Sequence, residues 1–166
     1  WPALRGAGIL RCPATVARAA GMFREKRLEA VHANGARCML VAGPAARRAG
    51  LPCVWHVRVL ERDGWLDRFR ARYASVILAN SRAVSDTLAA TGVRADLIRI
   101  IYNGLPLDAL RRVAPVNLAE VFHLPPGPML LAAGRMTPWK RFEDLLRACR
   151  LLADQGTPVG CVLAGS

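Results

Sequence analysis

The sequence lacks the cysteine and glycine patterns that mark several common kinds of site. Its five cysteines, at positions 12, 38, 53, 149 and 161, form no Cys-x-x-Cys pair. This odd, unpatterned set argues against a zinc site and a disulfide framework, and indicates reduced thiols in a cytosolic protein. No Gly-x-Gly-x-x-Gly fingerprint follows a strand-like run, so a dinucleotide-dependent oxidoreductase is disfavoured.

Long apolar runs are also missing, although 53% of the 166 residues are hydrophobic. A charged residue, a glycine or a proline interrupts every apolar run before it reaches the ~18 to 20 residues that span a bilayer. The hydrophobic fraction itself rules out intrinsic disorder and predicts a packed core. We therefore expect a cytoplasmic protein whose contact with a membrane is limited to a peripheral one at the inner face.

Lysine and aromatic residues are scarce in a chain whose formal net charge is +12. Of the 24 basic residues only Lys26 and Lys140 are lysines, and the arginines are scattered over most of the sequence. Nucleic-acid binding needs a contiguous basic face with stacking aromatics, but aromatics make up only 6% and occupy core-like positions. Compositional bias is the preferred explanation for most of the net charge, and binding to acidic small molecules or anionic lipid headgroups is the second. We predict no nucleic-acid partner.

Short β-type runs alternate with helix-length segments from end to end. Continuous apolar strands at this spacing predict βαβ crossovers and a doubly wound parallel sheet buried on both faces. The expected strands are 29–33, 53–57, 75–79, 98–102, 129–133 and 159–164, and the expected helices are 14–27, 36–49, 65–72, 81–90 and 139–153.

Prolines gather where this alternation pauses, between Leu105 and Met129, with one short helical candidate at 117–122. We interpret the pause as a linker between two α/β domains. The predicted division is residues 1–110, the linker 111–127 and residues 128–166. Because the chain starts without Met and stops straight after a strand-like run, we expect each domain to be only partly present.

The segment from Leu130 to Arg141 carries the clearest chemical signal. A hydrophobic strand ends at Gly134, Arg135 follows at once, and Lys140 is predicted on the first turn of a helix capped by Thr137. A guanidinium, an ammonium and free helix N–H groups directed at one point suit a phosphate or diphosphate. Solvated charges beside a loop are the alternative that spacing alone leaves open.

Taken with Val31–Gly35, Ile77–Ser81 and Ile100–Gly104, this segment resembles the GT-B glycosyltransferases of family 4, the glycogen synthase-like retaining group. The similarity runs from about Leu28 to the end, in the order of the family's motifs. It implies two Rossmann-like domains, with the acceptor held by the first and the nucleotide-sugar donor mainly by the second. The expected activity is retaining hexosyl transfer from a nucleotide-diphosphate sugar to a glycan or lipid-linked acceptor in cell-envelope polysaccharide synthesis.

By the same resemblance, Gly134, Arg135 and Lys140 would bind the donor diphosphate, and the two cations would stabilise the charge on the leaving group. We expect no metal and no other cofactor, in keeping with the lack of an Asp-x-Asp motif. His56, after the second strand, would lie near the reaction centre as a third catalytic residue, unless it is a half-buried strand histidine.

On the acceptor side the resemblance places His32, Asn34 and Arg58, with Glu61 in the same loop as Arg58. Turn formation alone also explains Asn34 and the glycine after it. Helix capping by Ser81 explains much of the Asn80–Ser81 motif, and a tight turn explains Asn103–Gly104.

Two parts of the family pattern are missing: the N-terminal glycine-rich loop and the spaced pair of glutamates in the second domain. We therefore expect this segment alone to be inactive, and the donor base and sugar are not readable from it. The alternatives are a sugar-nucleotide epimerase of the same fold and an incomplete fragment that only binds anions.

Overall fold

A computed structural model describes residues 12–60, 63–124 and 127–166. The chain divides into two compact units, Trp1–Leu105 and Pro106–Ser166. This division lies upstream of the predicted linker, 111–127. The second unit begins with two short helices, α6 (Leu107–Arg111), which the sequence pattern did not predict, and α7 (Leu118–Val121), which matches the short helical candidate.

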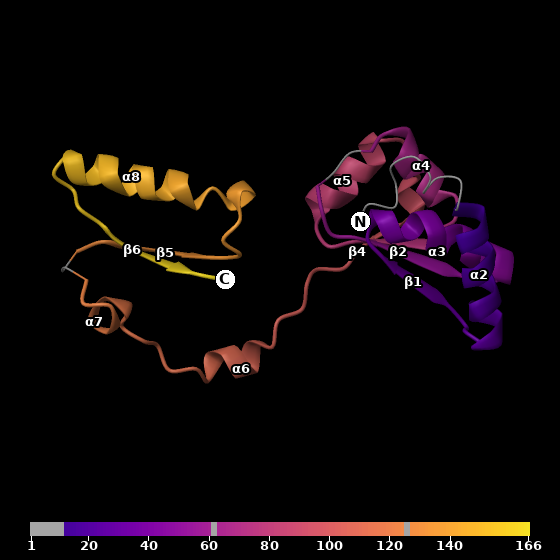
Figure 1. Ribbon diagram of the computed structural model, residues 1–166, viewed down its shortest axis with the longest axis horizontal. Helices are drawn as coiled ribbons and strands as arrows, with labels where there is room; N and C mark the ends of the chain where they lie inside the picture. Colours follow the sequence, from indigo (N-terminus) through magenta and orange to yellow (C-terminus); the bar gives the residue numbers. More distant parts are fainter. Residues whose placement is uncertain (1–11, 61–62, 125–126) are drawn as a thin grey trace. The chain divides into compact units, whose positions relative to one another are not determined.

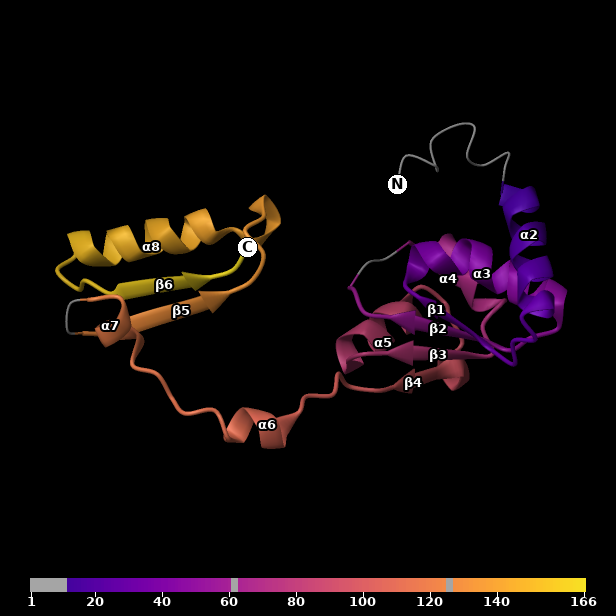
Figure 2. The ribbon, with the colours of Figure 1, turned by 60° about the horizontal axis from the view of Figure 1, so that its bottom comes forward.

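The first unit is built around a four-stranded parallel sheet in the order β1-β2-β3-β4. Its strands lie side by side and run in the same direction (Figure 2). The elements are α2 (Cys12–Glu25), β1 (Val31–Asn34), α3 (Ala36–Ala49), β2 (Cys53–Val57), α4 (Trp65–Ala71), β3 (Val76–Ala79), α5 (Arg82–Ala90), the 3-10 helix η2 (Ala95–Leu97) and β4 (Ile98–Ile100).

Among the described residues, helices cover one face of this sheet. Successive strands step in one direction across the sheet, so right-handed crossovers carry α3, α4 and α5 to the same side. Burial consequently alternates along β1, β2 and β3. The sequence pattern predicted burial on both faces, whereas within the described residues one face is covered and the other is open. Continuous apolar runs do not distinguish a covered face from an open one.

The core on the covered face is led by Trp55 and Ile77 from the strands, Met39 from α3 and Leu88 from α5, all at most 2% exposed. Close packing requires glycine at position 43 of α3, because a Cβ there would lie 2.7 Å from the Tyr73 Cβ. This contact fixes the close spacing of α3 from the segment after α4.

Local signals define the start and end of α5 as the sequence predicts. The Ser81 hydroxyl accepts a hydrogen bond from the Val84 N–H at 3.2 Å, which caps the helix. Gly92 follows its C-terminus with φ +85°, the left-handed exit. Thr91 closes the last turn by donating its hydroxyl hydrogen to the Leu88 carbonyl at 2.7 Å.

The second unit pairs β5 (Met129–Ala133) with β6 (Gly160–Ala164) in parallel register, from Met129↔Gly160 to Ala133↔Ala164. Helix α8 (Phe142–Asp154) runs alongside both strands (Figure 1). The predicted apolar face of α8 is half-buried at Phe142, Leu145, Cys149 and Leu152, whereas Leu146 is 49% exposed. The helix is thus amphipathic over the strand pair.

The predicted start of this helix is wrong. Residues Pro138–Lys140 form a separate 3-10 helix, η3, and Arg141 takes a left-handed conformation (φ 55°) before α8 begins at Phe142. The Thr137 side chain makes no cap; its hydroxyl lies 3.4 Å from the Arg135 carbonyl, to which it donates. Proline at the first helical position fits either kind of helix, so the Thr-Pro pair could not distinguish them.

Candidate functional site

Two glycines bring the carboxyl ends of β5 and β6 into close contact. A Cβ on Gly165 would lie 1.8 Å from the Gly134 carbonyl oxygen, so only glycine fits there. Gly134 itself has φ +159° and donates its N–H to the Ala164 carbonyl at 2.8 Å. The Met136 N–H continues this ladder to the Ser166 carbonyl at 3.1 Å. The backbone after each strand is therefore held in one position, next to Arg135.

Arg135 and Lys140 come together at a third residue, Trp139. The Lys140 ammonium lies 4.5 Å from the Trp139 ring centroid, and the Arg135 guanidinium carbon lies 5.7 Å from it. Both cations are solvent-exposed, and neither has an acidic partner among the described residues. Cation–π contact orients both charges at the carboxyl edge of β5, where parallel α/β sheets bind ligands.

The N-terminus of α8 contributes less to an anion site than the sequence suggested. Its first turn carries Glu143 and Asp144, and Asp144 is bound by both Arg141 and Arg147, the latter at 2.9 Å. These carboxylates already complement the positive end of the helix dipole. The attraction for an anion in this region rests on Arg135 and Lys140.

In the first unit, the predicted residues His32 and His56 meet on the open face of the sheet. Their rings stack with centroids 5.5 Å apart and an interplanar angle of 16°. His56 is half-buried, and its Nε2 is a buried atom without a hydrogen-bond partner. Burial first, then the charges of His32 and Arg58, lower the His56 pKa below 6.5, so the ring is neutral at pH 7. His56 can therefore offer a neutral imidazole ring to a polar ligand.

Asn34 and Arg58 lie at the carboxyl edge of the same sheet. Asn34 ends β1 with its side chain exposed, and the N–H of the following glycine, Gly35, bonds to the His56 carbonyl at 2.9 Å. The Asn80 side-chain amide donates to the Arg58 carbonyl at 3.4 Å, which supports the loop after β2. Asn80 thus has a supporting role, as turn and cap chemistry suggested.

The family profile "Glycosyltransferase Family 4" matches residues 1–109, well over half of the sequence. The chain belongs to glycosyltransferase family 4. No curated protein sequence gives a significant match.

Solved structures with a similar fold include HepE from Anabaena in complex with UDP and glucose, at 24% identity and a TM-score of 0.66. The match covers 89% of this chain and 42% of HepE. The lipopolysaccharide outer core galactosyltransferase WaaB, in its apo form, matches at 17% identity and a TM-score of 0.62, over 96% of this chain and 50% of WaaB. UDP-N-acetylglucosamine 2-epimerase from Rickettsia bellii matches at 14% identity and a TM-score of 0.53, over 92% of this chain and 43% of the epimerase.

These likenesses confirm the predicted fold class, a GT-B arrangement of Rossmann-like α/β domains of which only part is present. The family 4 chain spans half or less of the length of each of these three proteins.

Sequence reasoning missed two features of this family 4 chain. The first is Trp139, whose place between Arg135 and Lys140 is the signal for a shared ring contact. The second is an ion-pair network in which the buried Arg70 and Asp67 are joined by the exposed Asp63, and no periodic pattern gives a signal for it. Glu61, considered for the acceptor loop, lies outside the described residues.

Within the described ranges no cluster of three or more His, Cys, Asp or Glu could hold a metal ion. No helix in the same ranges is long and apolar enough to cross a membrane.

Proposed function

We propose that the full-length protein is a retaining glycosyltransferase that moves a hexosyl group from a nucleotide-diphosphate sugar to a glycan or lipid-linked acceptor. The setting would be cell-envelope polysaccharide synthesis at the cytoplasmic face of the membrane. The observation that carries the proposal is the pair of cations, Arg135 and Lys140, oriented by one tryptophan ring at the carboxyl edge of β5. Membership of family 4 supports the reaction class.

The chemistry assigned to these cations is electrostatic. When the bond between the sugar's anomeric carbon and the donor phosphate breaks, negative charge gathers on the leaving nucleoside diphosphate. Fixed positive groups stabilise the transition state, in which this charge develops, more than they stabilise the ground state, and this lowers the activation barrier. Arg135 can bind two phosphate oxygens at once, and Lys140 supplies a compact charge. The proposal therefore assigns to side chains the neutralisation that a divalent ion provides in other transferases, and it includes no cofactor.

The first unit would hold the acceptor. A neutral His56 can accept a hydrogen bond from a sugar hydroxyl or donate one, whereas an imidazolium could only donate. The buried Nε2 of this ring has no hydrogen-bond partner among the described residues, and His32 is stacked against the ring. Asn34 and Arg58 at the strand ends would contact the acceptor's polar groups.

An epimerase is the second candidate, because the Rickettsia bellii structure shares the fold. HepE, solved in complex with UDP-glucose, and WaaB, a galactosyltransferase, match with higher TM-scores than the epimerase. The family 4 profile also favours transfer.

Product analysis with the full-length protein distinguishes these reactions. Nucleotide-diphosphate sugars labelled at the anomeric carbon are incubated with membrane and soluble glycan acceptors. Transfer releases free nucleoside diphosphate and gives a labelled product with the donor's anomeric configuration. An inverted configuration would contradict the retaining assignment, and a labelled epimer of the donor would support the epimerase instead.

A further inference from the structure

Helix α4 reverses the usual distribution of residues on a surface helix. Asp67 and Arg70 face inward and are each 3% exposed, whereas Trp65 on the outer side is 68% exposed. An amphipathic helix of a globular protein normally buries its apolar stripe and exposes its charges. The reversal indicates that the outer face of α4 serves a purpose other than packing.

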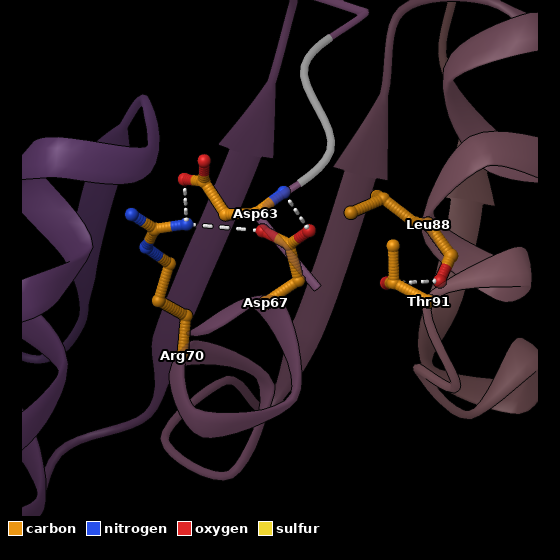
Figure 3. A network of polar contacts seen from close by, with 5 residues as sticks. All are labelled: Asp63, Asp67, Arg70, Leu88 and Thr91. Carbon is orange, nitrogen blue, oxygen red and sulfur yellow. Dashed lines mark hydrogen bonds and ion pairs between the residues drawn. The ribbon is translucent and has the colours of Figure 1, made fainter. Parts of the chain in front are cut away.

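The buried charges fix α4 in this orientation. Figure 3 shows Arg70 directed at two carboxylates, with its Nη1 2.5 Å from an Asp63 oxygen and 3.0 Å from an Asp67 oxygen. The second Asp67 oxygen accepts the backbone N–H of Asp63 at 2.9 Å. Because this network joins the loop before α4 to the helix interior, rotating the helix would break every one of these bonds.

Aromatic and arginine side chains alternate along α4 and the turn that follows it. Trp65, Arg68 and Phe69 lie at positions i, i+3 and i+4 of α4, and Arg72 and Tyr73 follow in the turn after the helix. The side chains of Trp65, Arg68 and Arg72 are exposed, whereas Phe69 and Tyr73 are half-buried beneath them. We call these five residues the α4 stripe. The Phe69 and Tyr73 rings meet edge to face with centroids 5.4 Å apart. Arg47, from the end of α3, lies over the Tyr73 ring at 5.8 Å and extends the basic surface.

Two adjoining hollows are lined by this stripe. The larger, of about 410 Å³, includes Arg68, Arg72 and Arg94, and the smaller includes Trp65, Arg68, Phe69 and Arg72. Arg94 is paired with Asp96, whose pKa is lowered mainly by that hydrogen bond, so these two charges cancel. Arg68 and Arg72 have no acidic partner among the described residues. The hollows therefore carry uncompensated positive charge.

We propose that the α4 stripe is the surface by which this protein docks on an anionic phospholipid membrane. Tryptophan prefers the headgroup region, and arginines are attracted to anionic lipids, so the exposed Trp65 beside Arg68 and Arg72 fits an interfacial surface. The inference deepens the peripheral membrane contact in the proposed function, on which it rests. The larger hollow lies toward the amino-terminal ends of β3 and β4, so docking there would leave the carboxyl edge with Asn34 and Arg58 free for the acceptor.

Vesicle flotation of the full-length protein tests the proposal. The protein is mixed with phosphatidylcholine vesicles that contain or lack phosphatidylglycerol. Wild type is expected to float with the anionic vesicles only. The double variant Arg68→Gln/Arg72→Gln is expected to have a partition coefficient about 30-fold lower than wild type. The double variant Arg68→Lys/Arg72→Lys keeps both charges and should retain binding to the anionic vesicles. Trp65→Ala should weaken the part of the binding that persists at high ionic strength.

The matched control is Arg18→Gln with Lys26→Gln, two exposed cations of the same unit. It removes equal charge and is expected to bind as wild type. The docking proposal would be overturned if this control lost as much vesicle binding as the Arg68→Gln/Arg72→Gln variant, or if that variant lost none. Failure of wild type to float, or its displacement by inorganic phosphate or single-stranded DNA at charge-equivalent concentration, would also overturn it. Transfer to a soluble acceptor is measured separately, so a failed transferase assignment remains distinguishable from a failed membrane surface.

Discussion

Replacing Arg70 with Met should destabilise the first unit by about 3 to 5 kcal/mol, the usual consequence of leaving a buried charge unpaired. The Arg70 and Asp67 side chains are each only 4% exposed, so water cannot replace the lost partner. Asp63 is different: its side chain is 38% exposed. Asp63→Asn leaves the Arg70–Asp67 pair intact and should therefore cost less than about 1 kcal/mol.

A second variant separates unpaired charge from lost packing. Arg70→Met combined with Asp67→Asn removes both charges and keeps an oxygen acceptor for the Asp63 N–H, so it should recover more than half of the lost stability. Hydrogen exchange of the β2 and β3 amides, measured in the full-length protein, reports the opening free energy of this unit alone. The reasoning fails if Arg70→Met is as stable as Asp63→Asn, or if the double variant is less stable than the single one.

Three further predictions concern other parts of the chain. Burial, His32 and Arg58 hold the His56 pKa below 6.5, so the free energy of unfolding should fall as the pH decreases below 6.5. His56→Gln should remove this pH dependence. The same dependence in wild type and His56→Gln would contradict the prediction. Gly165→Ala should separate the ends of β5 and β6 and weaken nucleotide binding measured by calorimetry, whereas Gly104→Ala, where a Cβ meets nothing within 4 Å, should not. Burial and the neighbouring Cys149 raise the Cys161 pKa, so iodoacetamide should alkylate Cys161 more slowly than the exposed Cys38; mass spectrometry of the labelled peptides decides.

Much of the fold could be predicted from local sequence patterns. Five of the expected strands, from 53–57 to 159–164, overlap observed strands closely, because β-branched and aliphatic runs between helical stretches leave few alternatives. The Ser81 cap and the Gly92 exit are local hydrogen-bond and φ requirements, so their residues reveal them.

What could not be predicted depends on tertiary contacts. Which face of a strand is covered depends on the direction of the crossovers, and so the open face that carries His32 and His56 was not foreseen. The start of α8 moved to Phe142 because Arg141 adopts a left-handed conformation, which non-glycine residues rarely do. The α4 network required Asp63 and Arg70 to meet through a loop, and sequence spacing does not specify loop geometry.

Donor binding by Arg135 and Lys140 is the central claim, and one kinetic comparison tests it most directly. Lys140→Ala in the full-length protein should lower turnover of the nucleotide-sugar donor by about 10² to 10³, since one preorganised charge at the leaving group is removed. The control is Arg150→Ala, which removes an exposed cation on α8 that pairs with Asp154, and this variant should turn over at the wild-type rate. Near-normal turnover of Lys140→Ala, or an equal loss in Arg150→Ala, would contradict the account.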